Sequence, residues 1–270
     1  GTGYTFEALL ARGPLAETPG VAGAGVPAAL AGMRILVVED NALNQQLAVE
    51  LLEEAGVVVS VADDGEAALG CLETGTFDLV LMDIQMPGMD GYTATRRLRS
   101  MPGLAGLPVV AMTAHALADE RERCLAAGMD DIIVKPVVPA LMYATIARYR
   151  GAAATPPEAG DPPDALPNMA DAPPIDRATG LRYAGGKPAL FARLLQRFHE
   201  TQFDLMTRIE EASARGDEVE AYRLAHTLKS TAGTIGAGAL SDAARTLEAA
   251  YEAADADAVK IGRASCRERV

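Results

Sequence analysis

Short apolar runs recur between residues 33 and 150 and alternate with amphipathic stretches. The runs are rich in Val and Ile, which is typical of strands buried on both faces of a sheet. The stretches between them repeat apolar residues at helical spacing, as Leu43, Leu47 and Leu51 do before Gly56 in the helix-stop position. The five runs cover residues 35–38, 57–59, 79–82, 109–112 and 132–134.

Five strands alternating with five helices predict an α/β fold with a parallel, doubly wound sheet. In such a sheet the functional site lies at the carboxyl ends of the strands, near the point where the strand order reverses. The residues that directly follow the apolar runs are therefore the first place to look for chemistry.

The pattern changes on both sides of this unit. Residues 1–32 are rich in Gly, Ala and Pro and predict a leader without a regular period. Residues 151–174 are Pro-rich and predict a semi-extended linker. From about residue 175 the spacing is wholly helical, with apolar stripes such as the one formed by Leu240, Leu247 and Tyr251, which predicts an all-α bundle.

Composition narrows the functional classes. A net charge of -13 argues against a nucleic-acid partner, which would need a basic face. No apolar run approaches the roughly 18 residues that a membrane segment requires, and no signal peptide opens the chain. The three cysteines lack metal-like spacing, and we expect Cys71 and Cys124 to be buried thiols of a cytoplasmic protein.

Charged and hydroxyl residues follow four of the predicted strands. Glu39 and Asp40 follow the first strand, and Asp83 the third; Thr113 follows the fourth strand and Lys135 the fifth. Carboxylates that converge on one sheet edge repel each other by roughly 4 kcal/mol per pair at an effective dielectric constant near 20. A hard divalent ion offsets such repulsion, and Mg²⁺ suits this pocket because it keeps coordination positions open for phosphate oxygens.

The pocket predicts phosphoryl chemistry. Asp83 is the expected nucleophile, because a carboxylate can form an acyl phosphate. Lys135 would neutralise phosphoryl charge, and the Thr113 hydroxyl would donate to a phosphoryl oxygen. The alternative is an acidic edge that a lysine ion pair merely stabilises. Five matched positions at four strand ends favour the phosphoryl site over that alternative.

Residues 33–150 resemble a response-regulator receiver domain, which has a flavodoxin-like fold. The resemblance rests on VVEDN at 37–41, the run DLVLMDIQMPGMDG at 78–91, AMTA at 111–114 and VKP at 134–136. It implies that Asp83 is the phosphoacceptor and that Thr113 and Lys135 contact the phosphoryl group. It also implies that the Mg²⁺ ligands are Glu39, Asp40, Asp83 and the carbonyl of Gln85.

One position departs from this pattern. Receivers that switch an output domain usually carry an aromatic residue three positions before the lysine, and this chain has Ile132 there. Aromatic-coupled switching is therefore in doubt, whereas a receiver that acts as a relay station needs it less. Asn41 and Asn44 resemble the receivers that are fused to sensor kinases.

His226 is the histidine with the most informative neighbours. Leu224 and Leu228 would face the core, so His226 would point outward, and Lys229 one turn later would meet a phosphoryl group. The small residues Ser230 and Gly233 on the same face would let another active site approach the imidazole. These neighbours favour a phosphoacceptor over an ordinary surface histidine.

This helical region resembles a histidine phosphotransfer domain, a four-helix bundle that presents a phosphohistidine to a receiver. The resemblance rests on AHTLKSTAG at 225–233, on GLRY at 180–183, and on residues 236–248. The order receiver, linker, phosphotransfer domain is that of the end of a hybrid sensor histidine kinase. It implies an upstream histidine kinase core and a downstream response regulator receiver as partners.

Both ends carry unusual sequence. Residues 1–10 weakly resemble the last strand of a kinase ATP-binding domain. Residues 261–270 are basic and correspond to one reading frame of a common sequencing adapter, so we expect residues 260–270 to be a non-native tail. The phosphotransfer domain would then cover 175–259, lack most of its fourth helix and expose an apolar seam. Sequencing the genomic locus decides this point.

Two rival functions stay open at this stage. The chain could be a non-catalytic interaction module whose acidic pocket only gates a partner. It could also be a fragment of an ATP-dependent hybrid kinase, although it contains no Gly-rich ATP lid and should not use ATP by itself.

Overall fold

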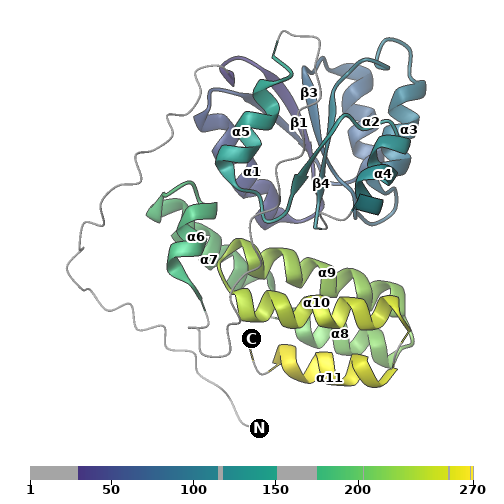
Figure 1. Ribbon diagram of the computed structural model, residues 1–270, viewed down its shortest axis with the longest axis vertical. Helices are drawn as coiled ribbons and strands as arrows, with labels where there is room; N and C mark the ends of the chain where they lie inside the picture. The colour runs from purple at the N-terminus through teal and green to yellow at the C-terminus, as the bar shows by residue number, and fades with distance from the viewer. Residues whose placement is uncertain are drawn as a thin grey trace, which may run out of the picture.

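The computed structural model places two domains, a sheet-containing domain and a helical one (Figure 1). The expected leader up to residue 29 and the Pro-rich linker at 151–174 lie outside the described residues. Within the described part of the chain, none of the helices has the length and apolar character that crossing a bilayer requires. The structure describes residues 30–114, 118–150, 175–202, 204–254, 256–267 and 269.

The N-terminal domain contains a five-stranded parallel sheet in the order β2-β1-β3-β4-β5. This order confirms the doubly wound fold. Val38 pairs with Met82, and Thr113 with Val134, so the strands end at a common edge. The strands are β1 (Arg34–Val38), β2 (Val58–Ala62), β3 (Leu79–Asp83), β4 (Val109–Thr113) and β5 (Asp131–Val134).

Helices cover both faces of this sheet (Figure 1). Alternate strand residues face opposite sides, so Ile35 and Val37 pack in one cluster and Leu36 and Val38 in the other. The first cluster includes α1 (Ala42–Glu54) and α5 (Pro139–Ala147). The second includes α2 (Gly65–Thr74), α3 (Gly91–Ser100) and α4 (Ala118–Ala126).

Both edge strands differ from the expectation that all strands are buried on both faces, because Val134 of β5 is 42% exposed. Val58 and Val61 of β2 are 57% and 39% exposed. β2 is the outermost strand on its side of the sheet, so the covering helices leave part of it open.

The C-terminal domain is helical, as predicted. Four of its helices form a closed bundle in which α9 packs against α8 and α10, and α11 packs against α10 and α8. The other two, α6 and α7, stand beside this bundle, and α7 also contacts α1 of the sheet domain. The helices are α6 (Arg177–Tyr183), α7 (Pro188–Gln202), α8 (Leu205–Ala214), α9 (Glu218–Thr234), α10 (Gly238–Glu252) and α11 (Ala256–Arg267).

The structure corrects the expectation of a missing fourth helix. Residues 256–267 form α11, and its buried residues Val259, Gly262 and Cys266 lie on one face. A Cβ on Gly262 would lie 3.0 Å from Leu247 Cα, so glycine permits close packing of α11 on α10. The bundle therefore extends past residue 259, and its seam is covered. The origin of residues 261–270 stays a prediction.

Removing residues 260–270 should destabilise the bundle. Leu247 is fully buried and packs against Gly262, so the deletion exposes it to water. We expect the free energy of unfolding to fall by about 1–3 kcal/mol. Urea denaturation followed by circular dichroism measures this, with a chain ending at Arg267 as the control. Equal midpoints for the two chains would contradict the structural role of α11.

Candidate functional site

Three carboxylates gather at the carboxyl edge of the sheet. Glu39 and Asp40 directly follow β1, and Asp83 ends β3, which is the neighbouring strand. One oxygen from each carboxylate lies within 4.8 Å of the others. Glu39 and Asp83 are only 2% and 3% exposed. The predicted convergence of these side chains is confirmed.

Lys135 follows β5 and enters the same cluster. Its Nζ donates to Glu39 Oε2 at 2.5 Å and to Asp83 Oδ2 at 2.6 Å. Thr113 ends β4 and is buried, and its carbonyl accepts from the backbone N–H of Lys135 at 2.7 Å. The structure therefore brings all five sequence-predicted pocket residues to one edge.

The buried carboxylates perturb one another. Burial raises the pKa of Asp83, and the charge of Glu39 raises it further, while Lys135 opposes both. Burial and Glu39 likewise raise the pKa of Asp40 to about 6. Burial alone would lower the pKa of Lys135, but its attraction to Asp83 and Glu39 outweighs this and the pKa rises. The cluster thus contains three carboxylates and one ammonium group, so its net charge favours binding of a further cation.

A glycine fits α3 against the end of β3. A Cβ on Gly91 would lie 2.2 Å from the carbonyl oxygen of Asp83, so a larger residue would displace the backbone that carries Asp83. The backbone N–H of Gln85 donates to Asp83 Oδ1 at 3.2 Å. The Gln85 side chain reaches the helical domain, where its Nε2 donates to Tyr222 Oη at 3.2 Å.

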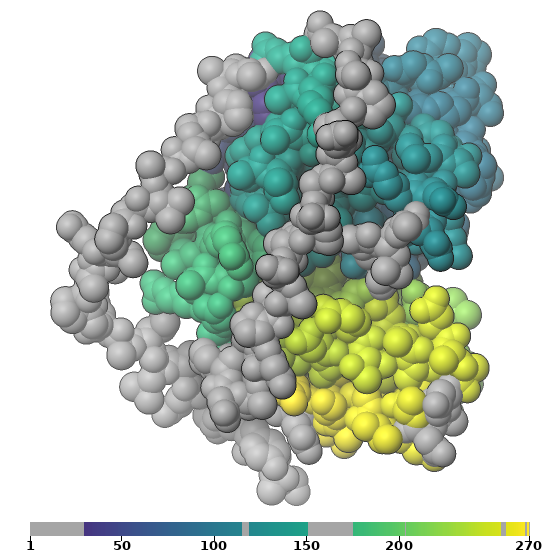
Figure 2. Space-filling view, in the orientation of Figure 1, coloured from purple at the N-terminus to yellow at the C-terminus, as the bar shows by residue number. Residues whose placement is uncertain are grey.

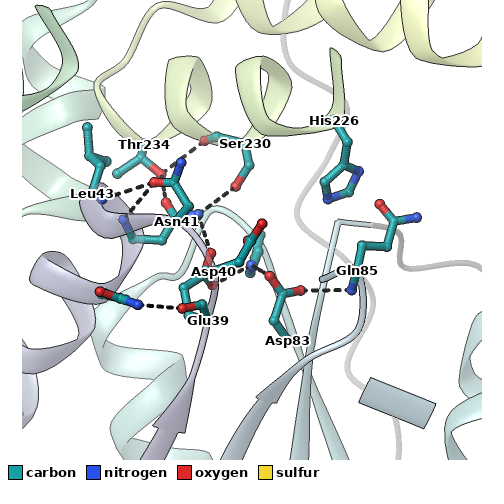
Figure 3. Close-up of polar contacts among 12 residues, drawn as sticks. Glu39, Asp40, Asn41, Leu43, Asp83, Gln85, His226, Ser230 and Thr234 are labelled. Carbon is teal, nitrogen blue, oxygen red and sulfur yellow. Dashed lines mark hydrogen bonds and ion pairs between the residues drawn. The ribbon is translucent and has the colours of Figure 1, made fainter. Parts of the chain in front are cut away.

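Helix α9 lies over this edge of the sheet (Figure 3). Asn44 of α1 links the two domains, because its Nδ2 donates to Glu39 Oε1 at 2.9 Å and to Ser230 Oγ at 3.2 Å. A second link joins Arg223 Nη1 and Asp40 Oδ2, which are 3.6 Å apart. Asn44 and Arg223 thus connect α9 to the sheet edge beside Glu39 and Asp40.

The expected small-residue face of α9 is confirmed by its packing. A Cβ on Gly233 would lie 3.6 Å from Pro136 Cγ, directly beyond the pocket lysine. In this structure the protein surface that packs against the small residues of α9 is therefore the chain's own sheet domain.

His226 projects from α9 toward the edge that carries Asp83 and Gln85 (Figure 3). It points out of the bundle, as expected, but the docked sheet domain leaves it only 7% exposed. Its Nδ1 lies 2.6 Å from Glu248 Oε1. A carboxylate only accepts hydrogen bonds, so Nδ1 carries the proton and Nε2 keeps its lone pair. Burial lowers the pKa of His226 more than Glu248 raises it, which favours the neutral imidazole.

Lys229 is placed differently from the expectation. Its Nζ donates to Glu248 Oε2 at 2.5 Å, and its side chain is only 5% exposed. In this structure its charge is therefore engaged by a carboxylate, and a contact with a phosphoryl group stays a prediction. Burial lowers the pKa of Lys229 against the attraction of Glu248.

Glu248 is the site residue that sequence reasoning did not single out. Its carboxylate accepts from both His226 and Lys229 and is buried in α10. Burial by itself would raise its pKa, but these two partners lower it to about 2. The sequence signal that could have identified Glu248 was its position directly after Leu247 of the predicted apolar stripe.

Glu248→Ala should weaken the bundle strongly. The substitution leaves the buried ammonium of Lys229 without a counter-charge, which costs about 3 kcal/mol in the free energy of unfolding. Urea denaturation measures the loss. The matched control is Glu252→Ala on the exposed side of α10, which should cost under about 0.5 kcal/mol. Similar losses for the two variants would show that the Glu248 pair stabilises nothing.

The contribution of Glu248 should depend on pH. Its folded pKa lies below the usual value of 4.5, so its stabilisation is present above about pH 4.5 and is lost as pH falls toward about 2. We therefore expect the stability gap between the wild type and Glu248→Gln to be full at about pH 6 and to shrink by about pH 3. Urea midpoints measured across this range test the trend. A gap that widens on acidification would refute it.

Comparisons with known proteins agree with this geometry. Residues 35–147 match the family model for the response regulator receiver domain, and residues 193–267 match that for the Hpt domain. The chain is 34% identical over 231 residues to the sensor histidine kinase GacS of Pseudomonas protegens, an alignment covering 83% of this chain and 25% of the relative. It is 30% identical over 216 residues to the signal transduction histidine-protein kinase BarA of Escherichia coli, covering 80% of this chain and 24% of that protein.

A solved structure is also similar in sequence to the sheet domain. The receiver domain of a sensor histidine kinase from Pseudomonas aeruginosa is 39% identical, with a TM-score of 0.43, and the match covers 45% of this chain and all of that one. The chain spans about a quarter of the length of the two curated relatives. It therefore belongs to the two-component phosphorelay proteins, with a response regulator receiver domain followed by an Hpt domain, as in a hybrid sensor histidine kinase.

Proposed function

We propose that this chain passes a phosphoryl group between Asp83 and His226 in a Mg²⁺-dependent relay. The observation that carries the proposal is the docking of α9 over the pocket, with His226 projecting toward the sheet edge where Asp83 lies (Figure 3). Asn44 and Arg223 hold this arrangement through their contacts on either side of the imidazole. The relay thus has its donor and its acceptor on facing surfaces.

Mg²⁺ fits the donor set of the pocket. Three carboxylates with oxygens within 4.8 Å of one another, and the Gln85 carbonyl just beyond Asp83, offer the oxygen ligands that this ion prefers. When bound, the ion neutralises charge on the phosphoryl oxygens. The excess of carboxylates over the single Lys135 ammonium supports a cation requirement.

The side chains divide the transfer between them. Nε2 of the neutral His226 attacks phosphorus, a P–N bond forms, and the P–O bond to Asp83 breaks with the carboxylate as leaving group. No proton needs to move, because Nδ1 keeps its hydrogen and Glu248 balances the positive charge that develops on the ring. Lys135 and Thr113 would contact the phosphoryl oxygens during this step.

The chain is then an intermediate station. The phosphoryl group would reach Asp83 from the histidine of an upstream kinase core and would leave His226 for the receiver of a separate response regulator. Ile132 in place of an aromatic switch residue supports a receiver that relays phosphate and does not drive an output domain. The reverse order of transfer uses the same contacts.

Labelling with acetyl phosphate tests the relay. With Mg²⁺ we expect alkali-labile label on Asp83 and then alkali-stable phosphohistidine on His226. Asp83→Ala should lose both, His226→Ala should lose only the stable label, and His199→Ala serves as the matched control that keeps both. A chelator should reduce labelling at least about tenfold, because the carboxylates then lack their neutralising ion.

Two outcomes would overturn the proposal. Stable label on the Asp83→Ala chain would show that His226 takes phosphate by another path. Label that stays on Asp83 in the wild type would show that His226 is not its acceptor. A pocket that neither binds Mg²⁺ nor takes label would favour the non-catalytic interaction module.

A further inference from the structure

The helix pair α6 and α7 lies between the two family matches. The receiver match ends at residue 147 and the Hpt match begins at residue 193, so α6 and the first part of α7 belong to neither. In the space-filling view this pair, coloured green, fills the angle between the teal receiver and the yellow bundle (Figure 2). Its contacts reach both domains, which suggests a role in joining them.

One side of the pair is fixed to the bundle. The backbone N–H of Asp176, the N-cap of α6, donates to the Gly236 carbonyl at 2.9 Å, just past the end of α9. A Cβ on Gly180 would lie 2.2 Å from the Phe191 ring and 2.8 Å from the Ile235 carbonyl oxygen. The contacts are close, so α6 and α7 keep a set position relative to α9 and His226.

The other side of the pair packs on the receiver. Gly185, in the turn between α6 and α7, adopts φ +64°, and a Cβ there would lie 3.2 Å from Leu51 Cδ2 of α1 and 4.0 Å from Pro139 Cγ of α5. Ala184 beside it is fully buried. The turn therefore touches the two helices that cover this face of the receiver sheet.

Two ion pairs complete this contact. Lys187 pairs with Glu54 and Arg193 pairs with Glu50, and both glutamates lie one turn apart on α1. These side chains are between 27% and 51% exposed, so the pairs add little to stability. Charges at the rim of a contact act mainly on the rate and the choice of docking.

We propose that α6 and α7 form a docking arm that selects this chain's own receiver domain for exchange with His226. The arm meets α1 with two basic residues against two acidic ones, and the receiver is the partner seated there. A receiver without acidic residues at the positions of Glu50 and Glu54 would dock through α9 and the apolar turn alone. This inference rests on the proposed relay and names the partner of the same histidine.

The test is a charge exchange in the full chain. After Asp83 is labelled with acetyl phosphate and Mg²⁺, transfer to His226 is timed at low salt. We expect the Lys187→Glu/Arg193→Glu chain to transfer at least about fivefold more slowly. Glu50→Lys/Glu54→Lys should slow it as much, and combining all four changes should restore the rate to within about twofold. Labelling of Asp83 reports that the receiver of each variant has folded, and the circular dichroism of its helices reports the helical domain.

Matched controls separate the arm from a general charge effect. Arg182→Glu/Arg197→Glu makes the same charge change on exposed positions of the same helices and should leave the rate unchanged. If a reversed variant fails to take label on Asp83, Lys187→Gln/Arg193→Gln should show a smaller loss of the same sign.

The outcomes distinguish this inference from the relay. Wild-type transfer with an equal rate in Lys187→Glu/Arg193→Glu would overturn the docking arm and leave the relay intact. Failure of the fourfold exchange to restore the rate would also overturn it. Absence of any transfer in the wild type would overturn the relay itself.

Discussion

Repulsion among three carboxylates at the carboxyl edge of the receiver sheet is the constraint on which the rest of the site depends. Lys135 contacts only two of them, Glu39 and Asp83. The third, Asp40, is approached by Arg223 of α9, and His226 lies one turn further along that helix. The same excess of negative charge that would attract a metal ion therefore also attracts the helix that carries His226.

The receiver pocket could be predicted from sequence because topology does most of the positioning. Once the apolar runs are read as parallel strands, Glu39, Asp83 and Lys135 must meet, since each directly follows a strand or ends one. Glu248 could not be predicted in this way. It reaches His226 from a different helix, and a helical period does not say how two helices are rotated against each other. Only its place beside Leu247 set it apart.

The fourth helix of the bundle shows a different limit of sequence patterns. Large apolar residues at helical spacing are the usual sign of a packed helix, and residues 260–267 offer Gly262 and Cys266 in their place. Small residues serve here because they let α11 approach Leu247 closely. A search for apolar stripes therefore detects helices that pack through large side chains. It misses helices that, like α11, pack closely through small ones.

Different residues orient His226 and dock the receiver. Glu248 and Lys229 belong to the bundle, so the tautomer of His226 is set inside the bundle and persists when the receiver leaves. The ion pairs of Lys187 and Arg193 with α1 are partly exposed and are screened by salt, so they can form and break. In the proposed relay His226 serves two receivers in turn, and this division suits that task. The hydrogen bond from Nδ1 to Glu248 is kept, and the surfaces around His226 determine which receiver occupies the site.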